Sequence, residues 1–188
     1  MDGKIILASN SPRRKELLRG LEIPFEVRLI SDIDESYPDE MVPTEIPVFL
    51  ARKKAAAYLS SLKENELLIT ADTIVIIDNQ VIGKPLDRDE AIRMLQQLSG
   101  STHEVITGVV LTSSAKQVEF SDHSFVDFGE LSLDEITHYV DTYCPYDKAG
   151  AYGIQEWIGY IGIQGIRGSF YNVMGLPVHK LYQELKAF

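Results

Sequence analysis

Lys4-Ile-Ile-Leu-Ala-Ser-Asn-Ser-Pro-Arg-Arg14 is the stretch of sequence that decides the fold. Residues 4–8 are mostly apolar, which is typical of a buried strand. Ser11 then offers a helix N-cap, and Pro12 suits the first helical position because its missing N–H is not needed there. A buried strand that leads directly into a helix is a building unit of α/β proteins. The stretch therefore predicts an α/β fold.

The chain beyond this unit continues to mix strand and helix patterns in an irregular order. Because strands and helices do not alternate strictly, we expect a mixed sheet instead of a purely parallel one. Apolar and β-rich runs predict strands at residues 25–30, 67–71, 103–112 and 117–126, with a hairpin over residues 74–82. Caps and apolar stripes predict helices at residues 12–19, 45–62, 88–98, 132–143 and 178–187.

Length and composition exclude several classes of protein. A chain of 188 residues with 45% hydrophobic residues is expected to form one folded domain. Its net charge of −10 disfavours a general nucleic-acid binder, which needs a basic face. The single cysteine, Cys144, excludes an internal disulfide and fits a reducing compartment. No apolar run approaches the ~18 residues of a membrane span and no signal peptide is apparent, so we expect a cytoplasmic protein without membrane contact.

Common catalytic motifs are missing from the sequence. It has no phosphate-binding loop of the G-x-x-x-x-G-K-[ST] type and no dinucleotide-binding G-x-G-x-x-G. Neither H-E-x-x-H nor G-x-S-x-G occurs. The four histidines, at positions 103, 123, 138 and 179, do not have the spacing of metal ligands. Zinc chemistry and Ser–His hydrolysis are therefore disfavoured.

Polar residues at the ends of predicted elements are the remaining candidates. The segment Ser9-Asn10-Ser11-Pro12-Arg13-Arg14 lies between a strand and a helix start, where anions bind; the alternative is a capped helix with solvated arginines. Lys54 lies on the apolar side of its predicted helix, so its ammonium either extends to water or meets an anion. Asp72 directly follows an apolar run, and open α/β sheets bind ligands at the carboxyl ends of strands; a plain turn is the alternative.

Three further segments carry polar groups that are weak signals when taken singly. The acidic segment Asp32-Ile-Asp-Glu35 is alone most simply solvated, and Lys84 lies in a stiff Gly-Lys-Pro turn. The segment from Lys148 to Gln155 is rich in small residues, which permit either a tight turn or close approach to a ligand. Basic groups and carboxylates together, without metal-binding histidines, suit a hard divalent cation and a polyphosphate.

The same residues, in their order and spacing, resemble the Maf family over nearly the whole chain. The matching motifs are Ala8-Ser-Asn-Ser-Pro-Arg-Arg14, Asp32-Ile-Asp-Glu35, Ala51-Arg-Lys-Lys-Ala55, Ala71-Asp-Thr73, Gly83-Lys-Pro85, Leu98-Ser-Gly-Ser-Thr-His103, Thr107-Gly108, Asp147-Lys-Ala-Gly-Ala-Tyr-Gly-Ile-Gln155 and Gly168-Ser-Phe-Tyr-Asn-Val-Met-Gly-Leu-Pro177.

The resemblance implies a nucleoside triphosphate pyrophosphatase. It implies one domain over residues 1–188, folded as a mixed twisted α/β sheet in two lobes with a central cleft, as in inosine triphosphate pyrophosphatases. It also implies a divalent cation (Mg²⁺, Mn²⁺ or Co²⁺) as cofactor and a homodimer, which is common in the family. One branch of the family prefers dTTP, UTP and modified pyrimidine nucleotides, and another prefers 7-methyl-GTP. Arg13, Thr73 after Asp72, and Gln155 match the pyrimidine branch.

The resemblance also implies a role for each candidate residue. Asp72 corresponds to the proton acceptor, and Glu35 is a second carboxylate that could share the metal with it. The basic residues around the phosphates are Arg13, Arg14, Lys54 and Lys84, with Ser9 and Ser11 adding hydroxyl contacts. Thr73 and Gln155 correspond to specificity positions. Two other functions stay open: hydrolysis of 7-methyl-GTP or non-standard purine nucleotides, and a nucleotide-binding regulator of cell division.

Overall fold

A computed structural model describes residues 3–188, which form seven strands in one sheet. The strand order is β2-β1-β3-β5-β6-β7, and β4 pairs with β3. β1 runs parallel to β2 and β3, whereas the β3–β4 and β6–β7 pairs are antiparallel, so the expected mixed α/β sheet is confirmed. The strands are β1 (Lys4–Leu7), β2 (Phe25–Val27), β3 (Glu66–Ile77), β4 (Gln80–Ile82), β5 (Thr102–Thr112), β6 (Gln117–Phe128) and β7 (Ile163–Arg167).

The helices agree with the sequence patterns wherever capping signals are strong. They are α1 (Pro12–Arg19), α2 (Ile46–Tyr58), α3 (Arg88–Leu98), α4 (Leu133–Tyr143), α5 (Trp157–Gly162), α6 (Phe170–Met174) and α7 (Val178–Ala187), with short 3-10 turns at Pro43–Glu45, Leu59–Ser61 and Ala149–Ala151. None of these described helices is long and apolar enough to cross a membrane.

The chain divides into two compact units, each with its own buried residues. The first contains the chain up to Thr73 together with Thr107–Asp122 and Gly175–Phe188. The second contains Ile74–Ile106 and His123–Met174. The expectation of a single functional domain with a central cleft stays a prediction.

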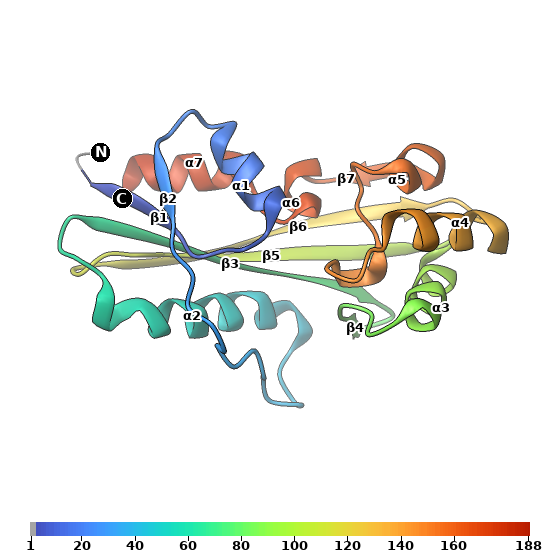
Figure 1. The fold of residues 1–188 in the computed structure, drawn as a ribbon, viewed down its shortest axis with the longest axis horizontal. Helices are drawn as coiled ribbons and strands as arrows, with labels where there is room; N and C mark the ends of the chain where they lie inside the picture. The colour runs from blue at the N-terminus through green and yellow to red at the C-terminus, as the bar shows by residue number, and fades with distance from the viewer. Residues whose placement is uncertain (1–2) are drawn as a thin grey trace. The chain divides into compact units, whose positions relative to one another are not determined.

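In the first unit, helices cover both faces of the strands. Figure 1 shows α2 on one face of β1 and the first part of β3, with α1 and α7 on the opposite face. Ile6 and Leu68 of the sheet pack with Ala51 and Tyr58 of α2, all of them buried. A Cβ at Gly108 would lie 2.4 Å from the backbone of α2, so glycine at this position of β5 lets the helix approach closely.

In the second unit, α3 and α4 pack against each other, and an ion pair joins them at the surface. Arg88 donates to the Asp141 carboxylate through Nε (2.6 Å) and Nη2 (3.0 Å). The predicted capping box is present at the start of α4, where Ser132 and Glu135 bond to each other's backbone N–H. His103 of β5, Phe128 of β6 and Tyr152 form a buried cluster of three rings.

Two of the expected strands end far from their predicted bounds, and β7 was not among the expected strands. The strand expected at residues 25–30 ends at Val27, because its partner β1 ends at Leu7, and the last backbone bond joins Arg28 N to Leu7 O (3.2 Å). The strand expected at residues 67–71 continues to Ile77, because residues 75–77 pair with β4. Asp72 therefore lies within a long strand, not at its carboxyl end.

Candidate active site

The start of α1 is held by the two serines of the first motif. Ser11 is the N-cap, and its Oγ accepts from Arg14 N (3.4 Å). The Oγ of the buried Ser9 accepts from Ser11 N (3.2 Å). A hydroxyl that accepts through its oxygen can still donate its own O–H. Both serines therefore shape the turn, and each hydroxyl keeps an O–H that can donate.

Arg14 fastens three separate segments of the first unit together. Its Nε donates to the carbonyl of Gly175 (2.8 Å), its Nη1 to the carbonyl of Ala71 (2.9 Å), and its Nη2 to Thr73 Oγ1 (3.0 Å). Burial lowers the pKa of the Arg14 guanidinium, and the negative charge of Asp72 opposes that shift. A guanidinium remains charged at neutral pH despite such a shift. Of its five N–H groups, at least three therefore serve the protein itself, and Arg14 acts at least partly as a structural clamp.

The clamp also fixes the hydroxyl of Thr73. Thr73 Oγ1 accepts from Arg14 and lies 2.9 Å from Thr107 Oγ1, so its own O–H can donate to Thr107. Gly175 has φ = +113°, a conformation that side chains rarely adopt, and this places its carbonyl beside Arg14. Thr107 and Gly175 were not among the predicted site residues, and the only signal for them in the sequence is their place in two of the family motifs.

A lysine joins the two predicted acidic residues. Lys54 Nζ lies 2.6 Å from Asp72 Oδ1 and 3.0 Å from Glu35 Oε1. The Lys54 and Asp72 side chains are 14% and 12% exposed, whereas that of Glu35 is 52% exposed. The sequence left two alternatives for Lys54, an ammonium that extends to water or one that contacts an anion. The structure shows the second. We call Asp72, Lys54 and Glu35 the carboxylate–lysine cluster.

A second lysine of α2 ties down the acidic loop that carries Glu35. Lys53 Nζ donates to Asp34 Oδ2 (2.6 Å) and to Ser36 O (2.9 Å). The hydrogen bond from Lys53, followed by those from Ser36, lowers the pKa of Asp34 to about 2. The acidic loop is therefore attached to α2 by two consecutive lysines and is not simply a solvated segment.

The two carboxylates of the carboxylate–lysine cluster are hard oxygen donors, the type of ligand that divalent cations such as Mg²⁺ prefer. Two carboxylates already converge on one positive charge, the Lys54 ammonium. Mg²⁺ is usually bound by one or two carboxylates together with water and substrate phosphates. Within residues 3–188, no group of three or more His, Cys, Asp or Glu side chains forms a metal site by itself. The donor set of Asp72 and Glu35 thus fits a divalent cation that is shared with a polyphosphate.

The other predicted residues have different surroundings. Arg13 is half-buried on α1. Lys84 is exposed after β4, and Gln155 is half-buried before α5; both belong to the second unit. The Gln155 Oε1 atom is buried without a hydrogen-bond partner among the described residues. A buried amide oxygen without a partner is costly, which makes it a candidate for binding a ligand.

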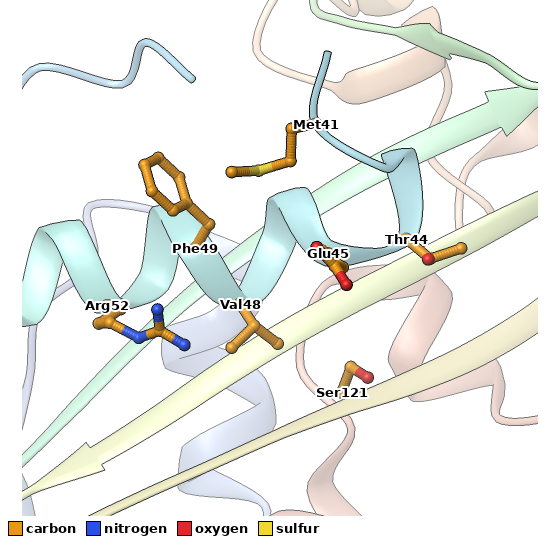
Figure 2. Close-up of a pocket in the computed structure, with 7 residues that line it drawn as sticks. All are labelled: Met41, Thr44, Glu45, Val48, Phe49, Arg52 and Ser121. Atoms are coloured by element: carbon orange, nitrogen blue, oxygen red, sulfur yellow. The ribbon is translucent and has the colours of Figure 1, made fainter. Parts of the chain in front are cut away.

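The first unit also has a surface cavity of about 450 Å³ that is separate from these residues. Figure 2 shows its lining, which comes from the segment before α2, from the first half of α2 and from Ser121 of β6. None of the predicted site residues lines it. Its one arginine, Arg52, pairs with Glu119 through Nε (2.6 Å) and Nη2 (2.5 Å), so its charge is already matched.

Comparison with known proteins identifies the family. The model of the family described as "Maf-like protein" matches residues 4–188. The chain is 62% identical to the dTTP/UTP pyrophosphatase of Parabacteroides distasonis, with 98% of this chain and 96% of that protein covered. It is 58% identical to the dTTP/UTP pyrophosphatase of Bacteroides thetaiotaomicron, with 97% and 95% covered. The chain therefore belongs to the Maf family, and the resemblance stated from its motifs is confirmed.

Among solved structures, a HAM1 protein from Coxiella burnetii covers 99% of this chain and 100% of its own, at 16% identity and a TM-score of 0.49. A TM-score below 0.5 is too low to support an inference about this chain.

Proposed function

We propose that the chain hydrolyses dTTP and UTP, together with modified pyrimidine nucleotides, to the monophosphate and pyrophosphate. Membership of the Maf family and the names of relatives at 58–62% identity support this activity. The observation that carries it is the carboxylate–lysine cluster, in which Asp72 and Glu35 meet at Lys54. We assign the proton acceptor, the cation site and a phosphate-binding lysine to this cluster.

Release of pyrophosphate requires attack of water at the α-phosphorus. The water oxygen bonds to phosphorus, the bond from phosphorus to the bridging oxygen of pyrophosphate breaks, and a proton must leave the water. Asp72 accepts that proton, because Lys54 holds its carboxylate in one position. A Mg²⁺, Mn²⁺ or Co²⁺ ion held by Glu35 and Asp72 would supply positive charge against the phosphates.

Basic side chains balance the charge that develops on the departing pyrophosphate. Lys54 is already part of the cluster, and the ammonium of Lys84 is exposed on its loop. Arg13 and the remaining N–H groups of Arg14 lie at the start of α1, where the helix dipole also favours anions. Ser9 and Ser11 add hydroxyl donors at the same helix start.

Gln155 reads the base in this proposal. Uracil and thymine present an imide N–H between two carbonyls, and an amide can accept from the N–H and donate to one carbonyl. The Oε1 of Gln155 has no hydrogen-bond partner among the described residues, so we assign it as the acceptor for the imide N–H. Cytosine lacks that N–H, and a polar mismatch in an enclosed site is strongly discriminated. Thr73, fixed by Arg14, is the second specificity residue.

A substrate panel with pyrophosphate detection tests the activity. We expect UTP and dTTP to be hydrolysed faster than CTP, 7-methyl-GTP and inosine triphosphate. Chelation should abolish the activity, and Mg²⁺, Mn²⁺ or Co²⁺ should restore it. Preference for 7-methyl-GTP, or release of phosphate instead of pyrophosphate, would refute the proposal. Binding of UTP without turnover would favour a nucleotide-binding regulator.

A charge change at Gln155 tests the reading of the base. In Gln155→Glu, a carboxylate faces the base carbonyls, and a buried acceptor without a donor costs about 1–3 kcal/mol. We expect kcat/KM for UTP and dTTP to fall relative to CTP, whose amino group can donate to the carboxylate. An unchanged ranking of the three nucleotides would remove Gln155 from base recognition.

Location and assembly belong to the same proposal. We expect the enzyme to work in the cytoplasm as a homodimer. Light scattering on the purified protein measures its mass and would reject the dimer if it gives that of one chain, 21.1 kDa.

A further inference from the structure

The segment that carries Gln155 is held by a buried network of hydrogen bonds and an ion pair. The residues of this network have no role in the reaction steps proposed above. Tyr139 of α4 is completely buried, yet it has a polar hydroxyl. This hydroxyl donates to Glu156 Oε2 and accepts from Gly153 N (3.0 Å). One side chain on a helix thus contacts the residue that follows Gln155 and the residue two positions before it.

The second oxygen of Glu156 is held as well. Lys148, whose side chain is 9% exposed, places its Nζ 3.3 Å from Glu156 Oε1 and 2.8 Å from Asp147 Oδ1. Both oxygens of the Glu156 carboxylate are therefore contacted: the Tyr139 hydroxyl donates to Oε2, and the Lys148 ammonium forms an ion pair with Oε1. Nearly buried charges are rare unless they are paired in this manner. If the Glu156 side chain turned away, the Tyr139 hydroxyl would lose this acceptor and the ion pair with Lys148 would break.

The backbone around Gln155 is closed by the same contacts. Glu156 N donates to Gly153 O (2.9 Å), which makes a tight turn with Gln155 inside it. A Cβ at Gly153 would lie 2.7 Å from the Glu156 carboxyl carbon, so only glycine allows that side chain to fold over the turn. Tyr139 thus holds both ends of a four-residue turn, and the direction of the Gln155 amide depends on it.

We propose that Tyr139, acting through Glu156 and the Gly153 N–H, positions the Gln155 amide and thereby sets the discrimination between uracil or thymine and cytosine. This inference rests on the proposed function, because it takes Gln155 as the residue that reads the base. Tyr139 is a positioning residue and not a catalytic one, since its side chain is completely buried and its hydroxyl bonds to Glu156 and Gly153. Lys148 supports it by fixing the other oxygen of Glu156.

Tyr139→Phe is the direct test, because it removes only the hydroxyl and keeps the ring that stacks on Tyr143 (5.0 Å between centroids). A shift of a contact group by about 1 Å can cost as much as a hundredfold in rate. We expect the ratio of kcat/KM for UTP to that for CTP to fall on the order of tenfold. The matched control is Tyr143→Phe, the same chemical change one helical turn later at a half-exposed ring, which should leave the ratio unchanged.

A double-mutant cycle separates positioning from a general loss of structure. In a Gln155→Ala background, the amide is gone, so Tyr139→Phe should not change the UTP-to-CTP ratio further. A second variant, Glu156→Gln, weakens the same network without removing the buried ring, and it should lower the ratio in the Gln155 background only. These two variants keep the test available if one of them folds poorly.

The outcomes distinguish failure of the proposed base reading by Gln155 from failure of the positioning role of Tyr139. Wild-type protein that hydrolyses UTP and CTP equally well would refute the proposed base reading and this inference with it. In a second outcome, the wild-type protein prefers UTP while Tyr139→Phe and Glu156→Gln both keep its UTP-to-CTP ratio. That result would overturn this inference and leave the proposed function standing. An equal fall of the ratio in the Gln155→Ala background would also overturn it, because Tyr139 would then act by another route.

Discussion

Replacement of Arg14 by lysine is expected to loosen the first unit, although the positive charge is kept. The guanidinium donates three hydrogen bonds, of 2.8, 2.9 and 3.0 Å, in three directions. A lysine ammonium is a compact charge on a flexible stem and cannot span these acceptors, so we expect it to keep one of them. Hydrogen bonds with a charged partner contribute about 1.5–3 kcal/mol each. Because Arg14 is only half-buried, the lower end of this range applies to its hydrogen bonds. The loss of two of them should therefore lower the free energy of unfolding by roughly 3 kcal/mol.

Thermal unfolding measures this cost. For a chain of this size, 1 kcal/mol corresponds to about 2–4 °C, so Arg14→Lys should lower Tm by roughly 6–12 °C. The control is Arg19→Lys, the same substitution at an exposed position of the same helix, which should change Tm by less than about 2 °C. If Arg14→Lys melts within 2 °C of the control, the three hydrogen bonds do not hold the first unit together. Arg14 would then be available to bind phosphate with its whole guanidinium.

Three further predictions concern catalysis and pH. Asp72→Asn should lower kcat for UTP by about 10²–10⁴-fold while Tm stays within a few degrees, and turnover within threefold of wild type would exclude Asp72 as the proton acceptor. Lys84→Ala should lower kcat/KM with little effect on Tm, because its side chain is exposed; a lower Tm with normal turnover would make Lys84 structural. Burial lowers the pKa of His103 to about 4. The unfolded chain, with a histidine pKa near 6.5, therefore takes up this proton first, so stability is lost as the pH falls from about 6.5 to 4. Urea unfolding at pH 7 and pH 4.5 should show a loss that is roughly 2–3 kcal/mol larger in wild type than in His103→Gln, and equal losses would contradict the buried neutral histidine.

Elements with strong local signals could be predicted from the sequence. The α1 boundary follows from the Ser11 cap and Pro12, and α4 begins at its capping box. The hairpin between β3 and β4 turns at Asp78 and Asn79, which both have positive φ, as expected of a two-residue turn with these residue types. In each case the residues that decide the structure lie within a few positions of each other.

Properties set by distant residues could not be predicted in the same way. The end of β2 depends on the length of β1, and the extension of β3 past Asp72 depends on pairing with β4. Asp72 can lie within a strand because Lys54, 18 positions earlier, satisfies its carboxylate. Arg14 and Gly175 are 161 positions apart, and no local pattern indicates that their bond exists. Only the family motifs pointed to these residues together.

The carboxylate–lysine cluster explains how one arrangement can serve both stability and the proposed reaction. Asp72 and Glu35 would repel each other as neighbouring carboxylates, and the Lys54 ammonium between them removes that cost. A divalent cation bound to the same carboxylates would take over this neutralisation and repel Lys54 as a like charge. The lysine would then be available to the phosphates that arrive with the cation. Asp72 would keep a positive partner before and after substrate binds, which is why a nearly buried carboxylate can be retained at this position of β3.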